Sequence, residues 1–135
     1  MFYGCTSLTT IPSDLLPATT LANGCYSNMF NGCTSLTTIP SDLLPATTLA
    51  KACYNHMFYG CKGLTTVPNL PATTLTDYCY NSMFWGCSSL TTIPSDLLPA
   101  TTLAIECYYM MFYNCSSLTT IPNLPATTLA KACYH

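Results

Sequence analysis

Arginine is absent from this chain, and charged residues of every kind are scarce. Asp, Glu, Lys and Arg make up only 6% of the residues, and the formal net charge is -2, whereas a typical globular domain is about 25% charged. Sequence-independent nucleic-acid binding needs a stripe of basic side chains that neutralises phosphates. The composition therefore argues against a nucleic-acid partner, and it predicts a surface covered by neutral hydroxyls and amides or by another molecule.

Long apolar runs are also missing, although half of the residues are hydrophobic. A membrane span needs about 18–20 consecutive apolar residues, so we expect none. The first residues, MFYGCTSL, lack the basic start, apolar stretch and cleavage site of a signal peptide. If the protein is exported, we expect that its leader has been removed or precedes this sequence.

One motif of about 28 residues occurs five times, in residues 1–28, 29–56, 57–82, 83–110 and 111–135. A fixed period of this length is typical of a solenoid, in which each unit buries its apolar face against its neighbours. We therefore expect a single solenoid domain over residues 1–135.

Each copy contains one segment with a helical spacing of apolar residues. Leu21, Cys25, Tyr26, Met29 and Phe30 recur in later copies, and the spacing i, i+4, i+5, i+8, i+9 is one face of an α-helix. The second residue after each Phe is Gly, or Asn in the last copy. Both residue types adopt the left-handed conformation readily. This slot, which predicts the end of each helix, holds Gly4, Gly32, Gly60, Gly86 and Asn114.

A strand-like segment follows, formed by Leu8–Ile11 and its equivalents and ended by a proline. The sequence thus predicts an α/β solenoid of five strand-turn-helix repeats with a parallel sheet. Two copies shorten PSDLLP to PNLP, at Pro68–Pro71 and Pro122–Pro125. Because surface loops tolerate changes in length, we expect this part of the coil to lie outside the packed core.

The run CxSLTTIP and the later MFxGC resemble the Treponema pallidum-type, or BspA-like, leucine-rich repeats along the whole chain. Met stands before Phe where that family usually has Ala, and the unit is longer by the LLPATTL segment. The resemblance implies a leucine-rich-repeat coil that serves as a binding or adhesion scaffold on a bacterial cell surface or in a secreted or phage-borne product. It implies no catalysis.

The ten cysteines raise the question of metal or disulfide bonds. Their separations of 8 and of 18 or 20 residues contain no C-x-x-C pair, and only His56 and His135 could join them, so we expect no metal site. Cys25 and Cys33 would lie about 12 Å apart on a helix, too far for a disulfide. Bonds between stacked copies would be within reach, but we favour buried thiols that act as small apolar wedges.

The adjacent Thr pairs would form hydroxyl ladders along the coil, as at Thr9 and Thr10 and their equivalents. Ice-binding solenoids carry related Thr arrays. Neighbouring residues of an ideal strand point to opposite faces, however, and Thr is a good strand former that stacks well on itself. We therefore favour a structural role.

A row of mostly aromatic residues precedes the helix-ending slot and would line the outside of the coil. Such a row suits contact with a protein or a glycan, or it packs flat over the neighbouring helix. The row consists of Tyr3, Asn31, Tyr59, Trp85 and Tyr113.

Catalysis has little support in the sequence. None of Asp14, Asp42, Asp77, Asp96 and Glu106 is paired with a His or a second acid at a spacing suited to acid-base chemistry, and there is no phosphate-binding loop or nucleophile elbow. We expect no enzyme activity, no catalytic residue and no cofactor.

Neither end of the chain resembles a capping repeat. Residues 131–135 repeat the pattern of 51–55, Met1 fills the slot of Met29, and one residue is missing at the joint. Head-to-tail contacts that do not close produce fibres, so we expect this chain to stack on itself. A window cut from a longer repeat protein and a designed consensus repeat are the competing accounts. The expected interface consists of Met1, Phe2, Cys5, Leu8, Leu118, Ile121, Leu129, Cys133 and Tyr134.

Two functions follow. The first is an extracellular filament of uncapped coils, and the alternative is a segment of a bacterial or phage surface adhesin that binds a host protein or glycan. Both place the protein outside the cell or at its surface.

Overall fold

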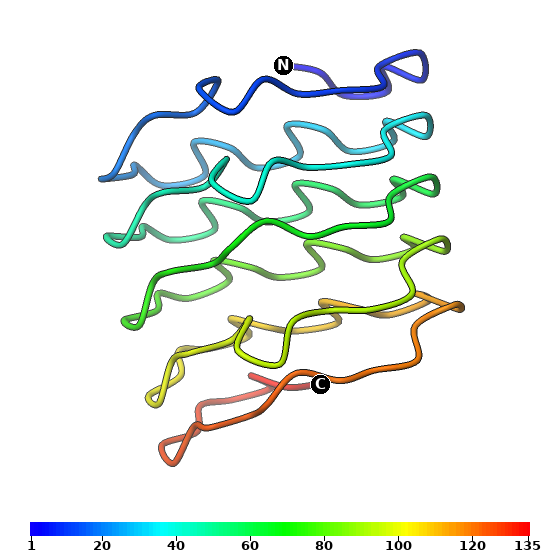
Figure 1. The fold of residues 1–135 in the computed structure, drawn as a ribbon. Helices are drawn as coiled ribbons and strands as arrows, with labels where there is room; N and C mark the ends of the chain where they lie inside the picture. Colours follow the sequence, from blue (N-terminus) through cyan, green and yellow to red (C-terminus); the bar gives the residue numbers. More distant parts are fainter.

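The chain folds into a stack of coils, described over all residues 1–135 by a computed structural model (Figure 1). The two termini lie at opposite ends of the stack. Each coil has two walls, an undulating one and a flatter one, and apolar side chains fill the space between them in one continuous core. The solenoid predicted from the repeat is therefore confirmed.

The predicted α-helices are wrong, because the structure contains no α-helix. In their place are ribbons of consecutive tight turns. Each ribbon has an amide that bonds to the carbonyl three residues earlier at every second position, as from Cys25 to Ala22 (3.3 Å) and from Met29 to Tyr26 (3.2 Å). Complete ribbons occupy residues 21–33, 49–61, 75–87 and 103–115, and parts of ribbons occupy 1–5 and 129–135.

Every fourth residue of a ribbon has a positive φ. In the first complete ribbon these residues are Gly24 (63°), Asn28 (56°) and Gly32 (75°), each the third residue of a turn, where a type II turn requires φ above zero. The slot that we predicted to end a helix is thus the last of three such positions. Later ribbons hold non-glycine residues here, including Ala52 (55°) and His56 (54°).

The remaining amides of a ribbon bond to the next coil. Tyr26 donates to the carbonyl of Cys53 and Phe30 to that of Met57, each at 2.9 Å. Alternate amides therefore stabilise the turn and the stack, and the ribbon leaves few backbone groups without a partner.

An exact period of four explains which ribbon side chains face the core. Leu21, Cys25, Met29 and Cys33 are spaced by four residues, with Tyr26 and Phe30 beside them. An α-helix has about 3.6 residues per turn. In a helix, the side chains of Leu21 and Cys33 would therefore point in directions about 120° apart. The ribbon keeps them on one side, so the predicted inward set is right although the predicted helix is wrong.

The flat wall forms no continuous parallel sheet. Isolated parallel bridges join Thr20 to Thr48, Thr74 to Thr102 and Thr102 to Thr128, and none lies in the predicted strand segment Leu8–Ile11. Further amides of this wall bond to the preceding coil, as from Thr65 to Thr37 (2.9 Å) and from Asn69 to Ser41 (2.8 Å).

Both residues of each Thr pair on the flat wall are exposed, for example Thr37 with Thr38 and Thr91 with Thr92. The expectation that adjacent Thr side chains point to opposite faces is therefore wrong, because the segment is not a regular strand. Some hydroxyls serve the stack, since the amide of Ile39 donates to Thr66 Oγ1 at 3.1 Å.

Two ladders of stacked aromatic rings run through the core along the axis. The first has ring centroids 5.4–5.7 Å apart and the second 5.7–5.9 Å. The phenylalanine ladder is Phe2, Phe30, Phe58, Phe84 and Phe112, and the tyrosine ladder is Tyr26, Tyr54, Tyr80, Tyr108 and Tyr134.

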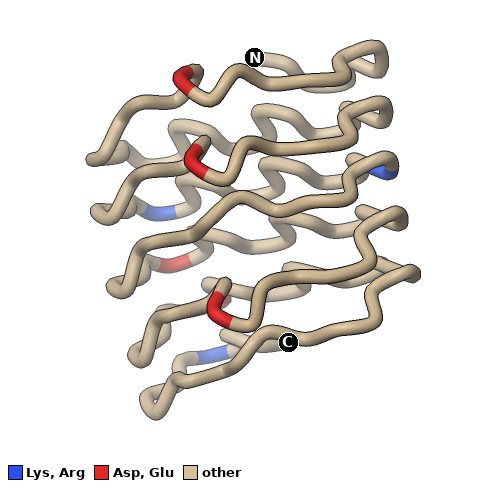
Figure 2. The backbone as a smooth tube through the Cα atoms, in the orientation of Figure 1, with Lys and Arg blue, Asp and Glu red and all other residues tan.

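The loops of variable length have an exposed turn, which holds Asp14, Asp42 and Asp96, but their leucines belong to the core, as at Leu43 (0% exposed) and Leu70 (4%). The expectation that this part of the coil lies outside the packed core is therefore wrong, because the leucines that follow the turn point inward. Charged residues are few and scattered over the stack (Figure 2). No helix is present that is long and apolar enough to cross a membrane.

Candidate functional site at the ends of the coil

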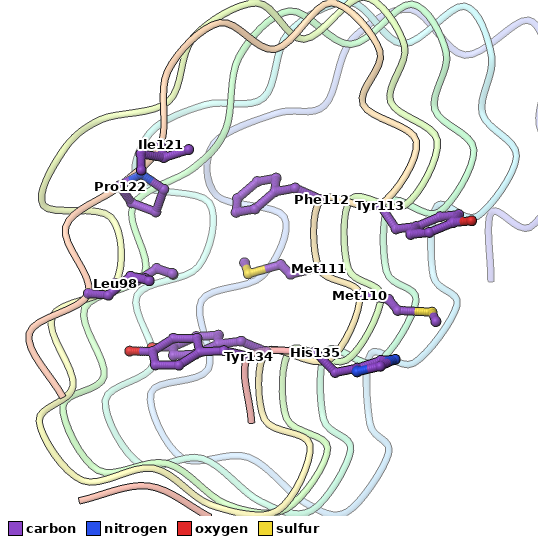
Figure 3. Close-up of a pocket in the computed structure, with 11 residues that line it drawn as sticks. Leu98, Met110, Met111, Phe112, Tyr113, Ile121, Pro122, Tyr134 and His135 are labelled. Carbon is purple, nitrogen blue, oxygen red and sulfur yellow. The ribbon is translucent and has the colours of Figure 1, made fainter. Parts of the chain in front are cut away.

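The C-terminal end of the stack contains an open cavity of about 320 Å³. It lies beside Met111 and Phe112 of the last complete ribbon, Tyr134 of the partial ribbon 129–135, and Leu98 and Ile121 across the coil (Figure 3). Residues 129–135 form only the first half of a ribbon, and the cavity lies beside them, lined mostly by apolar side chains.

Several ribbon amides at this end have no backbone acceptor, among them those of Phe112, Asn114, Leu129, Ala132 and Tyr134. The equivalent amides one coil earlier donate across coils, as from Phe84 to Met111 at 3.0 Å. The C-terminal end of the ribbon wall therefore presents a row of free donors.

The N-terminal end presents the matching acceptors. The carbonyls of Met1, Tyr3, Asn23 and Cys25 accept no backbone hydrogen bond, whereas the equivalent carbonyl of Met29 accepts from Phe2 at 2.9 Å. The two ends of the ribbon wall are thus complementary in donors and acceptors.

The residues predicted to form an end-to-end interface divide between the two ends. Met1, Phe2, Cys5 and Leu8 belong to the first coil, and Met1 is 93% exposed. At the other end Ile121 is 82% and Leu129 63% exposed, Leu118 and Tyr134 are half-buried, and Cys133 is buried. Phe112 and Met111 also line the cavity at this end, although the sequence pattern did not single them out. The order of the repeats indicates Phe112, because no later coil holds a phenylalanine in its column.

The predicted contact row follows the outside of the ribbon wall. Tyr59 and Trp85 have ring centroids 5.4 Å apart, and Trp85 and Tyr113 lie at 4.5 Å. Asn31 interrupts the row before Tyr3. The rings of Tyr59 and Trp85 are stacked at 30°, whereas those of Trp85 and Tyr113 are tilted by 47°. Because close neighbours cover part of each ring face, the row offers less open face for stacking on sugars. A surface groove of about 460 Å³ runs beside Tyr59 and Trp85 and includes Lys62.

All ten cysteines are free thiols, and eight of them are buried. The thiol of Cys61 donates to the carbonyl of Phe30 at 3.1 Å, and that of Cys115 donates to Phe84 at 3.1 Å. Burial raises the pKa of Cys53 to about 11 and that of Cys61 to about 12. The predicted buried thiols are present, apart from Cys5 and Cys25, which are exposed.

Metal-binding geometry is not found. No group of three or more His, Cys, Asp or Glu side chains is close enough to hold an ion.

Comparison with known protein families gives one match. The family model described as "BspA type Leucine rich repeat region (6 copies)" matches residues 47–131, which is more than half of the chain. No curated protein and no solved structure gives a match.

Proposed function

Because this chain belongs to the BspA-type leucine-rich repeat family, we propose that it is a non-catalytic structural protein whose copies stack head to tail into an extracellular filament. The observation that carries this proposal is the complementarity of the two ends of the coil. The partner in this assembly is a second copy of the same chain.

Joining two copies would complete one turn ribbon. Residues 129–135 of one copy followed by 1–5 of the next reproduce the order of residues 49–61, with one position left empty. The second copy would continue the coil by the same contacts that join coils within a chain.

The hydrogen-bond register continues across this joint. By analogy with the bond from Phe84 to Met111, the amide of Phe112 would donate to Met1 of the next copy, and that of Asn114 would donate to Tyr3. Likewise Ala132 and Tyr134 would donate to Asn23 and Cys25. Each bond contributes about 0.5–1.5 kcal/mol and fixes the register.

The apolar core continues as well. Met1 and Phe2 of the next copy would fill the cavity beside Phe112, and Phe2 would stack on Phe112 as it does on Phe30 at 5.4 Å. Full burial of an exposed Met, Ile or Leu contributes about 1.5–3 kcal/mol. Several such side chains together offset an association cost of about 4–15 kcal/mol, so the length of the filaments should depend on protein concentration.

A pair of substitutions tests the interface. Ile121→Lys places a charge in the joint, whereas Ile105→Lys changes the wall of the coil, in a slot that holds Lys51 and Lys131 in other copies. We expect wild type and Ile105→Lys to form filaments, seen by sedimentation and electron microscopy, while Ile121→Lys stays monomeric with an unchanged circular dichroism spectrum. A wild-type chain that stays monomeric at all concentrations, or filaments of Ile121→Lys like those of wild type, would overturn the proposal.

A second candidate function is that of a surface adhesin segment that binds a host protein or glycan, and the row of adjacent rings Tyr59, Trp85 and Tyr113 favours it. The covered ring faces fit a protein surface better than a sugar. Binding to immobilised extracellular-matrix proteins and glycans, compared between wild type and Trp85→Ala, tests this role. Loss of binding with unchanged self-assembly would support it.

A further inference from the structure

Two cysteines stand apart from the other eight. Cys5 and Cys25 are exposed, and both belong to the first coil. We propose that these two thiols are a modification site for low-molecular-weight disulfides, and that a mixed disulfide at either position closes the N-terminal end to stacking. The inference rests on the proposed head-to-tail assembly.

The place of the thiols in the fold explains why modification would block the joint. The thiol of Cys33 donates to the carbonyl of Phe2 in the preceding coil at 3.1 Å, and Cys61 repeats this contact with Phe30. At the joint, Cys5 of the next copy would donate to the carbonyl of Phe112 in the same way. A substituted sulfur has no hydrogen to donate there.

The space around the equivalent sulfurs is closed. Cys33 and Cys61, in the column of Cys5, are 0% exposed, and so are Cys53 and Cys79 in the column of Cys25. A stacked copy would enclose Cys5 and Cys25 as tightly. Any group larger than hydrogen on either sulfur would therefore hold the two copies apart, because packed interiors leave few voids larger than a water molecule.

The chemistry is thiol-disulfide exchange. Cys5 releases its proton, and the thiolate attacks one sulfur of the small disulfide. A bond forms between the two sulfurs, the original disulfide bond breaks, and the departing thiolate takes up a proton. One protein thiol is consumed and one small thiol is released, so no further oxidant is needed, and excess small thiol reverses the step. Buried cysteines are protected because the disulfide cannot reach them.

The test uses the chain of residues 1–135 with oxidised glutathione as the probe. Intact-mass spectrometry of the monomer should show two adducts, mapped by peptide analysis to Cys5 and Cys25. Light scattering should show loss of assembly in the treated sample and recovery after dithiothreitol. Iodoacetamide should cause the same loss without recovery.

A matched variant separates modification from other effects. Cys5→Ala combined with Cys25→Ala should assemble, and glutathione disulfide should leave its assembly unchanged. If the double variant folds poorly, each single variant should show one adduct. Adducts on other cysteines, or normal assembly of doubly modified wild type, would overturn this inference while the filament proposal stands. Failure of unmodified wild type to assemble would overturn both.

Discussion

Two alanines of one ribbon provide a test of the turn structure itself. Ala52 has a φ of 55°, whereas Ala50, in the same ribbon and also half-buried, is not among the positive-φ residues. We consider Ala52→Gly and Ala50→Gly. Both remove one methyl group, and both increase the backbone entropy of the unfolded chain, which costs about 0.5–1 kcal/mol.

The two positions differ in backbone strain, because only Ala52 has a positive φ. A left-handed conformation costs an L-residue about 1–2 kcal/mol, and Ala52→Gly relieves this cost. Ala52→Gly should therefore be neutral or stabilising by up to about 1.5 kcal/mol, while Ala50→Gly should destabilise by about 0.5–1 kcal/mol. Urea unfolding followed by circular dichroism measures both. In an α-helix each change would cost about 0.8–1 kcal/mol, so equal destabilisation by the two variants would refute the turn ribbon.

Two further predictions concern buried groups. Tyr80 is 1% exposed and its hydroxyl has no hydrogen-bond partner, so Tyr80→Phe should raise the free energy of unfolding by about 1 kcal/mol in urea, and a clear loss would contradict the unsatisfied hydroxyl. Because burial raises the pKa of Cys53 to about 11 and of Cys61 to about 12, the unfolded thiols ionise first as pH rises above about 9. Stability should be full at lower pH and fall by about 1.4 kcal/mol per pH unit for each such thiol up to its folded pKa. The range from about pH 7 to about pH 10.5 crosses the unfolded pKa of about 9, so a urea midpoint that is constant over this range would contradict the buried thiols.

The sequence predicts the contents of the core better than the backbone that holds them. Tyr54, Met57 and Phe58 face inward as expected, because hydrophobic spacing reports which side of a segment is buried. The same spacing fits a helix over short stretches. Only the exact interval of four from Leu21 to Cys33, with Gly24 and Gly32 at turn positions, distinguishes the ribbon.

Other features were beyond the reach of sequence patterns. Ala52 and Tyr78 occupy positive-φ positions that their residue types disfavour, because the hydrogen bonds to neighbouring coils impose the conformation. The expected end residues Met1 and Leu129 are exposed at the two ends. The cavity beside Phe112 depends on how far residues 129–135 extend around the coil, which only the three-dimensional structure gives.

The two walls of the coil have opposite electrical polarity. Ribbon amides such as that of Tyr26 point toward the C-terminal end, to Cys53, whereas flat-wall amides such as that of Thr65 point toward the N-terminal end, to Thr37. Aligned peptide dipoles add up along an α-helix, but here the two walls oppose each other. The bonds of the ribbon wall outnumber those of the flat wall, so the opposition is partial and a growing stack would keep a net dipole along its axis. A copy turned upside down would bring amide against amide on the ribbon wall, so the geometry admits one direction of growth per end.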